Sequence, residues 1–385
     1  MSPVTLIFVV FTSAAVLATV ALFARQAMIV AYIIVGIALG PSGVGVVRDA
    51  AWLEGIADIG IMFLLYLLGL NMVPAQLLRM MREATVVTLV SAVAFAAVGG
   101  GIALACGFAP REAVITGAAM MFSSTIIGLK LLPTTALHHQ HTGQVLISVL
   151  LLQDLLAILV LLGLQATGAG HGGAALLLQL VALPVLIAVA YALEHWVLEP
   201  LLTRFDRIQE YMFLLVIAWC LLLAELAHAC GLSHEIGAFI AGVALANCPV
   251  SLFIADSLRP LRDFFLILFF FSVGARLELG LVGETLAPAV ALAGAALIGK
   301  PWVFRRLFLR EGETHKLSTE AGVRLGQISE FSLLVAVLAT EVGVLGVRAS
   351  NALQLATVLT FIASSYYIVM RFPTPMAVRD NLRQD

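Results

Sequence analysis

The sequence predicts an all-α polytopic membrane protein with about thirteen transmembrane helices. Of its 385 residues, 62% are hydrophobic and 11% are charged, and the mean hydropathy is +1.07. A soluble domain is nearer to a quarter charged and has no means of burying so much apolar surface. The apolar residues form runs of spanning length, and the basic residues gather at alternate ends of these runs.

The predicted spans begin close to the N-terminus. The first apolar run has no basic n-region and no small-residue cleavage site, so we expect a retained span and not a signal peptide. Only a short corner at 231–235 divides the eighth span from the ninth. The spans are predicted at 4–23, 27–46, 52–72, 84–106, 112–132, 144–166, 174–198, 210–230, 232–250, 255–274, 285–304, 318–340 and 350–371.

The basic residues predict the orientation of the chain. With the N-terminus outside, the inner loops and the C-terminus hold fifteen Lys and Arg residues and the outer loops hold four. Because cytoplasmic loops carry the excess of Lys and Arg, we expect the N-terminus outside and the C-terminus in the cytoplasm. The net charge of -2 argues against a nucleic-acid partner.

One aspartate interrupts the apolar stretch "SVLLLQDLLAILVLL" (148–162). Asp154 is about ten residues into its span, roughly 15 Å deep and near the middle of a ~30 Å hydrocarbon core. A carboxylate there costs on the order of 3 kcal/mol to insert, so it should face the protein interior and carry function. The alternative is a structural hydrogen-bonding carboxyl. Burial disfavours its charged form, which would allow proton exchange near neutral pH.

Polar residues interrupt two further spans at similar depth. Isolated hydroxyls often bond to their own helix, but Ser123, Ser124 and Thr125 form a run of three, as a broken helix needs to satisfy freed backbone and line a cavity. The fifth and twelfth spans cross in opposite directions, and paired broken helices in inverted repeats indicate a transporter's binding site. The twelfth span contributes Arg324, Gln327, Ser329 and Glu330 around its glycine.

Lys300 adds a cation to the eleventh span, in "AALIGKPWVF". Its long side chain can reach the inner surface, where Arg305 and Arg306 already lie. Alternatively it is buried and pairs with Asp154 when no metal ion is bound. Pro301 disturbs a helix, which favours an irregularity near Lys300.

No resident metal site is predicted. His138, His139 and His141 lie within four residues, which is a possible transition-metal pattern. No acidic residue or Cys accompanies them, so a solvated loop is favoured, followed by a proton-responsive loop. The cysteines lack metal-site spacing and are expected to be small buried hydrophobes; they are Cys106, Cys220, Cys230 and Cys248.

Seven stretches in order along the chain carry a family resemblance. Together they are similar to the monovalent cation:proton antiporter-2 family, and most of all to the membrane domain of Kef-type potassium:proton antiporters. The stretches are "AYIIVGIALGPSGVG" (31–45), "FLLYLLGLNMVPAQL" (63–77), "FSSTIIGLKLL" (122–132), "LLLQDLLAI" (150–158), "GLSHEIGAFIAGVALA" (231–246), "LILFFFSVGARLELG" (266–280) and "LGQISEFSLLV" (325–335).

The resemblance implies the sodium/proton antiporter fold, with inverted repeats and two crossing discontinuous helices. An ion-carrying core would move like an elevator against a dimerising scaffold. The implied ranges are 1–82 and 210–274 for scaffold helices 1–3 and 8–10, 84–166 and 285–371 for core helices 4–6 and 11–13, 174–198 for linker helix 7, and 372–385 for a short cytoplasmic tail.

The resemblance also implies roles for the polar residues. Asp154 would carry the ion or the proton, and Gln153 stands where electrogenic relatives have a second Asp. Lys300 matches the family's basic residue, and Glu330 would stabilise the crossing helices. The predicted ion and proton site is Asp154, Gln153, Ser123, Ser124 and Thr125, supported by Lys300, Glu330, Gln327, Ser329 and Arg324.

The chain differs from the family pattern in two places. Asn71 stands where members often carry an acidic residue. The long cytoplasmic nucleotide-binding domain of Kef proteins is not in the sequence, so glutathione gating is not expected.

These observations favour an antiporter that exchanges a monovalent cation, K⁺ before Na⁺, for H⁺. One carboxylate holds a proton or a cation but not both, and Gln153 cannot ionise, so we expect electroneutral one-for-one exchange. A gated cation channel is the main alternative, although no filter loop rich in Gly is evident. An intramembrane enzyme is disfavoured because Asp154 has no second catalytic carboxylate at matching depth.

The expected setting is the bacterial inner (plasma) membrane. We expect a homodimer within the lipid bilayer, with the cation and the proton as substrates and no cofactor. An ancillary regulatory subunit is left open, and a sensor that uses a transporter fold is disfavoured.

Overall fold

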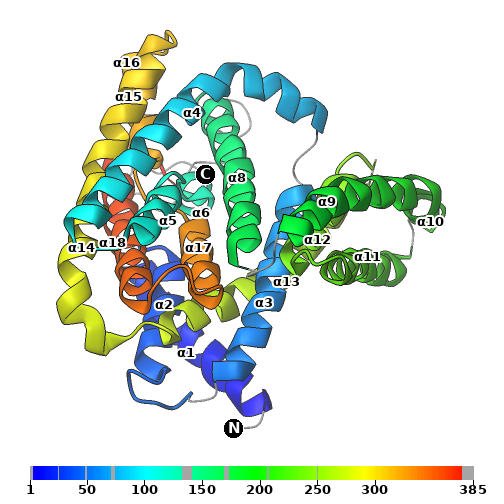
Figure 1. Ribbon diagram of the computed structural model, residues 1–385, viewed down its shortest axis with the longest axis horizontal. Coiled ribbons are helices and arrows are strands. Elements are labelled where there is room, and N and C mark those ends of the chain that lie inside the picture. The colour runs from blue at the N-terminus through cyan, green and yellow to red at the C-terminus, as the bar shows by residue number, and fades with distance from the viewer. Residues whose placement is uncertain are drawn as a thin grey trace. The chain divides into compact units, whose positions relative to one another are not determined.

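The computed structural model describes residues 3–24, 26–47, 50–70, 74–131, 141–168, 173–205, 208–248 and 250–374 (Figure 1). These residues form helices joined by short turns, so the predicted all-α class is confirmed for them. The chain divides into two compact units. Unit 1 comprises Met1–Arg48, Met80–Leu164 and Val273–Asp385, and unit 2 comprises Asp49–Arg79 and Gln165–Ser272.

Helix occupies each of the thirteen predicted ranges. Seven helices in the described residues are long and apolar enough to cross a membrane, and three shorter apolar helices accompany them. The number of spans therefore stays a prediction. The continuous helices are α1 (Pro3–Phe23), α2 (Met28–Leu39), α3 (Ala50–Leu70), α4 (Pro74–Ala105), α8 (His141–Gly168), α11 (Gln209–Ala229), α12 (His234–Leu245), α13 (Ser251–Ala275) and α18 (Val347–Arg371).

The fifth and twelfth ranges are broken, as predicted. Four residues separate helix α5 (Pro110–Met120) from α6 (Thr125–Lys130). Helix α16 (His315–Arg324) likewise ends before α17 (Glu330–Glu341). A serine caps the second helix of each pair: the Ser124 hydroxyl accepts from the Ile127 amide at 3.1 Å, and the Ser329 hydroxyl accepts from the Phe331 amide at 3.1 Å.

A π-helical segment interrupts the seventh and the eleventh range. Each segment is followed by a proline, Pro200 or Pro301, which lacks an amide hydrogen and leaves an earlier carbonyl without its helical donor. The irregularity expected near Lys300 is thus confirmed. The two helical runs are α9 (Gly173–Leu193), η1 (Glu194–Leu198) and α10 (Glu199–Arg204), and α14 (Val282–Gly294), η3 (Ala295–Gly299) and α15 (Lys300–Arg310).

Small residues allow close helix packing in unit 2. A Cβ atom on Gly69 would meet the Phe239 carbonyl, and one on Gly242 would meet the Tyr66 carbonyl. The α3 and α12 backbones are therefore in direct contact, which is a common way for membrane helices to associate. The Trp219 indole donates to the Ala241 carbonyl at 3.0 Å and fixes α11 against α12.

Unit 1 contains both broken helices. Helix α18 packs against α14 and α17, and α17 packs against α5. Residues 1–48 cluster with this unit, whereas the family resemblance places them in a scaffold. Core and scaffold are functional assignments, and they stay predictions.

Candidate ion-binding site

The two helix breaks are bonded directly to each other. The Ser123 hydroxyl in the first break donates to the Leu325 carbonyl in the second at 2.8 Å. In return the side-chain Nε2 atom of Gln327 donates to the Ser124 carbonyl at 3.3 Å. Broken helices leave backbone groups without helical partners, and here each break supplies partners to the other.

Asp154 lies on α8 beside the first break. Its side chain is 1% exposed, and the Thr125 hydroxyl, at the first residue of α6, lies 3.2 Å from both carboxylate oxygens. None of the ion pairs among the described residues includes Asp154. The structure therefore brings Asp154 and Thr125 together in a buried site where the charge of the carboxylate has no basic side chain paired to it.

Gln153 is committed to the backbone of the first break. Its Oε1 atom accepts from the Ser123 amide at 3.0 Å, and its Nε2 atom donates to the Met121 carbonyl at 3.4 Å. The predicted site residues Gln153 and Ser123 are thus in contact through the main chain. A part for Gln153 in ion binding stays a prediction.

Lys300 bridges both breaks. Its side chain is fully buried, so the interpretation that it reaches the inner surface is wrong. Its ammonium donates to the Phe122 carbonyl of the first break and, at 3.1 Å, to the Gln327 carbonyl of the second. It also lies 5.2 Å from the Phe95 ring centroid, in a cation–π contact. No Lys300–Asp154 pair is among the ion pairs of the described residues.

Gln327 organises the second break. Its Nε2 atom donates to the Arg324 carbonyl at 2.8 Å, in addition to the Ser124 carbonyl. Its Oε1 atom accepts from the Ser364 hydroxyl of α18 at 3.1 Å. The side chain of Gln327 thus connects the first break, the end of α16 and helix α18.

Arg324 is buried at the end of α16. Its guanidinium pairs with Glu320 at 2.9 Å. It donates to the Leu131 carbonyl, after α6, at 2.9 Å and to the Pro373 carbonyl, after α18, at 2.8 Å. Five donors in a rigid plane suit a residue that must satisfy several acceptors at once. Arg324 therefore connects the ends of three helices, and in this structure its bonds are structural.

Glu330 is the first residue of α17 and is largely buried. Its carboxyl group lies within electrostatic range of Asp154, so the second break brings a second acidic side chain toward the first. Ser329 caps this helix, as described above. Hydrogen bonds of Ser123, Lys300 and Gln327 join the two breaks. We name the polar residues at and beside the two breaks the crossing cluster: Ser123, Ser124, Thr125, Gln153, Asp154, Lys300, Arg324, Gln327, Ser329 and Glu330.

The sequence interpretation missed the polar face of α18. Thr360 accepts from the Ile328 amide at 3.1 Å, within the second break, and Ser364 bonds to Gln327. Ser332 of α17 donates to the Ala119 carbonyl of α5. A signal was present, because the buried polar residues of α18 recur every three or four positions: Ser350, Gln354, Thr357, Thr360 and Ser364.

Other predicted features lie away from the crossing cluster or outside the described residues. His138, His139 and Asn71 are outside the described residues. His141 begins α8, and its Nε2 atom lies 2.8 Å from the Glu313 carboxylate.

All four cysteines are free; Cys220 and Cys248 are buried as expected, whereas Cys106 is partly exposed and Cys230 exposed. The described residues contain no group of three metal-ligating side chains.

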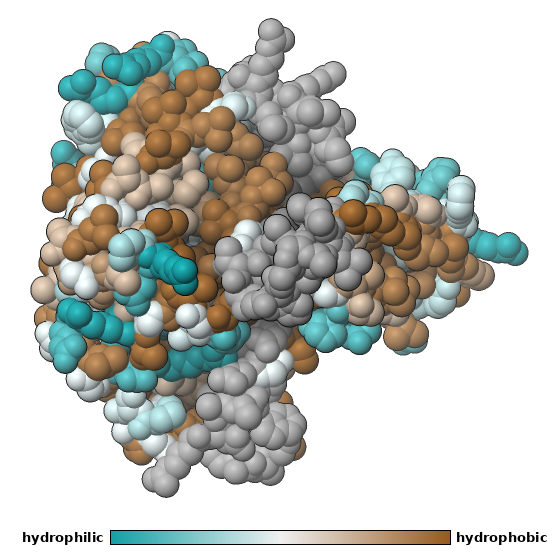
Figure 2. Space-filling view, viewed as in Figure 1, coloured by the Kyte–Doolittle hydropathy of each residue, from teal (hydrophilic) through white to brown (hydrophobic). Residues whose placement is uncertain are grey.

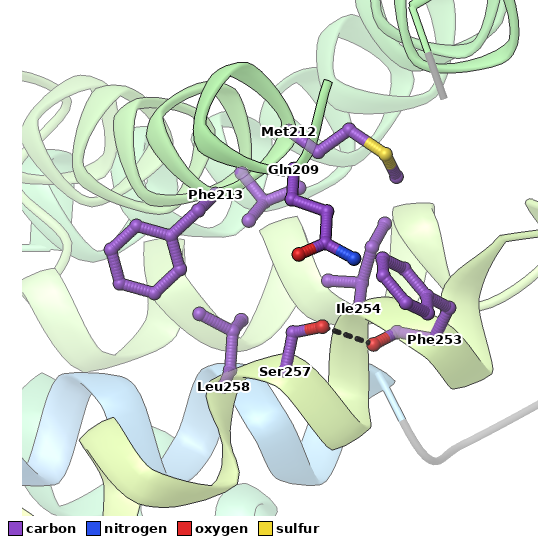
Figure 3. Close-up of a pocket in the computed structure, with 8 residues that line it drawn as sticks. Gln209, Met212, Phe213, Phe253, Ile254, Ser257 and Leu258 are labelled. Atoms are coloured by element: carbon purple, nitrogen blue, oxygen red, sulfur yellow. Dashed lines mark hydrogen bonds between the residues drawn. The ribbon is translucent and has the colours of Figure 1, made fainter. Parts of the chain in front are cut away.

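Unit 2 contains a separate pocket between α11 and α13 (Figure 3). Its accessible volume is about 250 Å³. The Gln209 amide and the Ser257 hydroxyl are the polar groups at this mostly apolar surface, and the hydroxyl donates to the Phe253 carbonyl at 2.8 Å. The pocket carries no acidic or basic side chain, unlike the crossing cluster of unit 1. Its lining residues are Gln209, Met212, Phe213, Val216, Phe253, Ile254, Ser257 and Leu258.

A comparison with models of known protein families identifies the family of this chain. The model of the transmembrane sodium/hydrogen exchanger family matches residues 9–370. The chain belongs to this family. This match and the relatives described next confirm the resemblance to the membrane domain of Kef-type antiporters, and the family match places the protein in a membrane as a multi-pass protein.

Several relatives of this sodium/hydrogen exchanger family member are known. K(+) efflux antiporters 6 and 4 of Arabidopsis thaliana are 29% and 28% identical over 325 residues, covering 81% of this chain and 54% of each relative. The chain thus spans about half the length of these relatives. The iron transporter MagA of Paramagnetospirillum magneticum is 26% identical over 352 residues, covering 89% of this chain and 80% of MagA.

A solved structure of another protein has a similar fold. The sodium proton antiporter MjNhaP1 from Methanocaldococcus jannaschii, at pH 8, superposes with a TM-score of 0.74. The match covers 95% of both chains at 16% sequence identity. The predicted helical antiporter fold is confirmed at this level, and the likeness extends to the fold alone.

Proposed function

We propose that this chain is a secondary antiporter, and not an enzyme, that exchanges a monovalent cation for a proton at Asp154. One observation carries the proposal: the buried carboxylate of Asp154 has a hydroxyl partner in Thr125, while the buried ammonium of Lys300 donates to two backbone carbonyls. A buried charge is costly unless it is paired or neutralised. A bound cation or a bound proton meets this requirement equally well.

Competition between the two ligands produces exchange. The carboxylate of Asp154 is neutralised by one proton or by one cation at a time, so the loading of one requires the release of the other. If the loaded site is exposed alternately to the two faces of the membrane, one gradient drives the other ion. We propose that the crossing cluster moves as part of an elevator-like core, with the hydroxyl of Thr125 and nearby carbonyls coordinating the dehydrated cation.

The proposed stoichiometry is one cation for one proton. Gln153 cannot ionise and is held by the backbone of the first break. Asp154 then supplies a single exchangeable charge, and each cycle moves no net charge. Reconstituted protein should show exchange rates that do not change with an imposed membrane potential. Rates that scale with voltage would contradict the electroneutral cycle.

The proposed cation is K⁺, with Na⁺ as the second choice. The support is that two relatives in sequence are named K(+) efflux antiporters, whereas the solved structure of like fold is a sodium proton antiporter. Everted vesicles assayed with K⁺, Na⁺, Li⁺ and Rb⁺ between pH 6 and pH 9 would rank the cations.

The deciding experiment for the site is the substitution Asp154→Asn in proteoliposomes. The amide has nearly the same shape but binds neither ion as a charge partner, so we expect exchange to fall at least a hundredfold while the purified protein keeps its thermal unfolding profile. Wild-type exchange in this variant would move the site elsewhere. Cation flux that persists without counter-transport would indicate the gated channel instead.

The proposed setting follows from the charge distribution and the family. We propose a homodimer in the bacterial inner membrane, with the N-terminus outside and the C-terminus in the cytoplasm. Accessibility labelling of single cysteines at each terminus in intact cells and in everted vesicles would test the orientation. Cross-linking within the membrane would test the dimer and reveal any ancillary subunit.

A further inference from the structure

The helical run formed by α14, η3 and α15 contains a long apolar stretch, and a charged residue lies just beyond each end of that stretch. Between Glu284 and Arg305 the single charged side chain is Lys300, which is fully buried. Residues 285–304 measure roughly 30 Å at about 1.5 Å per residue, which equals the thickness of a hydrocarbon core. Arg305 is therefore the first charged residue past the apolar stretch, at the depth of lipid headgroups.

One face of this run changes in polarity along its length. Ile298, Trp302, Arg306 and Arg310 recur every four residues and so lie on one side of the helix. Ile298 is 76% exposed and Trp302 is 58% exposed, and both arginines are exposed. Tryptophan prefers the membrane–water interface. The order along the face is therefore the order of layers in a bilayer: apolar, aromatic, cationic.

The contacts of the run hold this face in place. The Arg306 guanidinium lies 4.8 Å from the centre of the Trp302 ring. On the opposite side Phe304 and Phe308 are buried in the hydrophobic core of unit 1. The helix is thus fixed from behind, and the exposed face is available to a membrane component without rearrangement. In Figure 2 the end of the α15–α16 hairpin is mostly hydrophilic.

The arginines at the end of this face have no acidic partner among the described residues. No ion pair there includes Arg305, Arg306 or Arg310. Two arginines of α13 differ, because each is paired with an aspartate. These pairs are Arg259 with Asp256 at 3.0 Å and Arg262 with Asp263 at 2.9 Å.

We propose that Arg305, Arg306 and Arg310 bind the phosphate of an anionic phospholipid whose acyl chains lie along Trp302 and Ile298. Guanidinium groups bind phosphate oxygens in bidentate geometry, and the apolar and aromatic part of the face suits the chains and glycerol region of the same molecule. A free phosphate ion would gain nothing from that part. Each arginine near a membrane surface favours anionic lipid by about fivefold.

Native mass spectrometry of the full-length protein tests the proposal. The protein, purified in detergent, is equilibrated with equal amounts of phosphatidylglycerol and phosphatidylcholine, and the ratio of the two bound lipids is measured. We expect the wild type to prefer phosphatidylglycerol and the variant Arg305→Gln/Arg306→Gln/Arg310→Gln to lose that preference at least fivefold. The control Arg259→Gln/Arg262→Gln removes two arginines that are already paired, and should keep the wild-type ratio.

A second measurement needs no arginine variant and locates the lipid. Tryptophan fluorescence is quenched with brominated phosphatidylglycerol or brominated phosphatidylcholine, and the signal of Trp302 is the difference between wild type and Trp302→Phe. We expect stronger quenching of Trp302 by the anionic lipid, and a decline of this difference as salt is raised. Equal quenching by the two lipids, or an unchanged lipid ratio in the triple variant, would overturn the proposal.

Discussion

Thr125 and Asp154 are joined across a helix break, with the hydroxyl oxygen 3.2 Å from each oxygen of the carboxylate. Thr125 opens the short helix α6, and Asp154 lies in the middle of the long helix α8. The hydroxyl is available to the carboxylate because α5 ends before it and the chain turns. The break in the fifth predicted span is thus what gives the buried acid a polar partner.

The substitution Thr125→Val tests this contact. Valine has nearly the same shape but donates no hydrogen bond, and a bond to a charged group contributes about 1.5–3 kcal/mol. Because the ionised carboxylate loses this stabilisation, protonation is favoured over cation binding. We expect the apparent KM for the cation to rise about tenfold or more, measured as cation-dependent proton flux in proteoliposomes. Thr125→Ser keeps the hydroxyl and should restore most of the affinity; equal KM values for Val and Thr would contradict the role.

The broken helices could be predicted from the sequence because their signal is local. Three hydroxyl residues in a row and a cluster of polar residues around a glycine stand out against apolar runs. The capping serines, Ser124 and Ser329, are part of the same signal. Asp154 could be singled out for the same reason: a charge in the membrane needs an explanation.

The partners of Lys300 could not be predicted in this way. Its bonds go to backbone carbonyls of Phe122 and Gln327, and every residue has a carbonyl. Which carbonyls are unpaired depends on where the two helices stop and on how the breaks meet. The same holds for Arg324, whose acceptors at Leu131 and Pro373 are far from it in sequence.

The substitution Arg324→Ala should destabilise unit 1. It removes the partner of Glu320 and the donors to two carbonyls, and breaking a buried ion pair from one side typically costs about 3–5 kcal/mol. Thermal unfolding in detergent should therefore show a clear drop in Tm. The control Arg259→Ala breaks a pair whose side chains are both about two-thirds exposed, and such pairs contribute roughly 0–1 kcal/mol. Similar losses in the two variants would show that burial does not matter here.

The substitution Glu330→Gln separates the two carboxyl groups of the crossing cluster by function. If Asp154 alone exchanges ions, the Glu330→Gln variant should retain exchange at a rate independent of membrane potential, whereas Asp154→Asn loses exchange. Flux measured in proteoliposomes at several imposed potentials provides the comparison. Voltage-dependent exchange in Glu330→Gln, or complete loss in a folded protein, would assign Glu330 an exchangeable charge as well.

The contact between His141 and Glu313, which is an ion pair when the imidazole is protonated, should contribute little to stability. The two side chains are 60% and 20% exposed, and solvent-exposed pairs contribute about 0–1 kcal/mol and are screened by salt. The variant His141→Gln should therefore unfold within about 1 kcal/mol of the wild type, in low and in high salt. A larger loss that disappears in high salt would show that this pair fixes the start of α8.

The contact between α3 and α12 depends on the absence of side chains at two glycines. A Cβ atom on Gly242 would lie 2.1 Å from the Tyr66 carbonyl oxygen and 2.8 Å from the Leu70 amide nitrogen. Because both atoms belong to the backbone of α3, they cannot move without the helix. Gly242→Ala should thus force the helices apart and lower Tm, since overpacking costs about 1–3 kcal/mol. Gly163→Ala in α8 is the matched control, because a Cβ there meets no atom within 4 Å and alanine favours a helix by about 1 kcal/mol. A Tm for Gly242→Ala at or above that of Gly163→Ala would mean that the two helices are not held in this close packing.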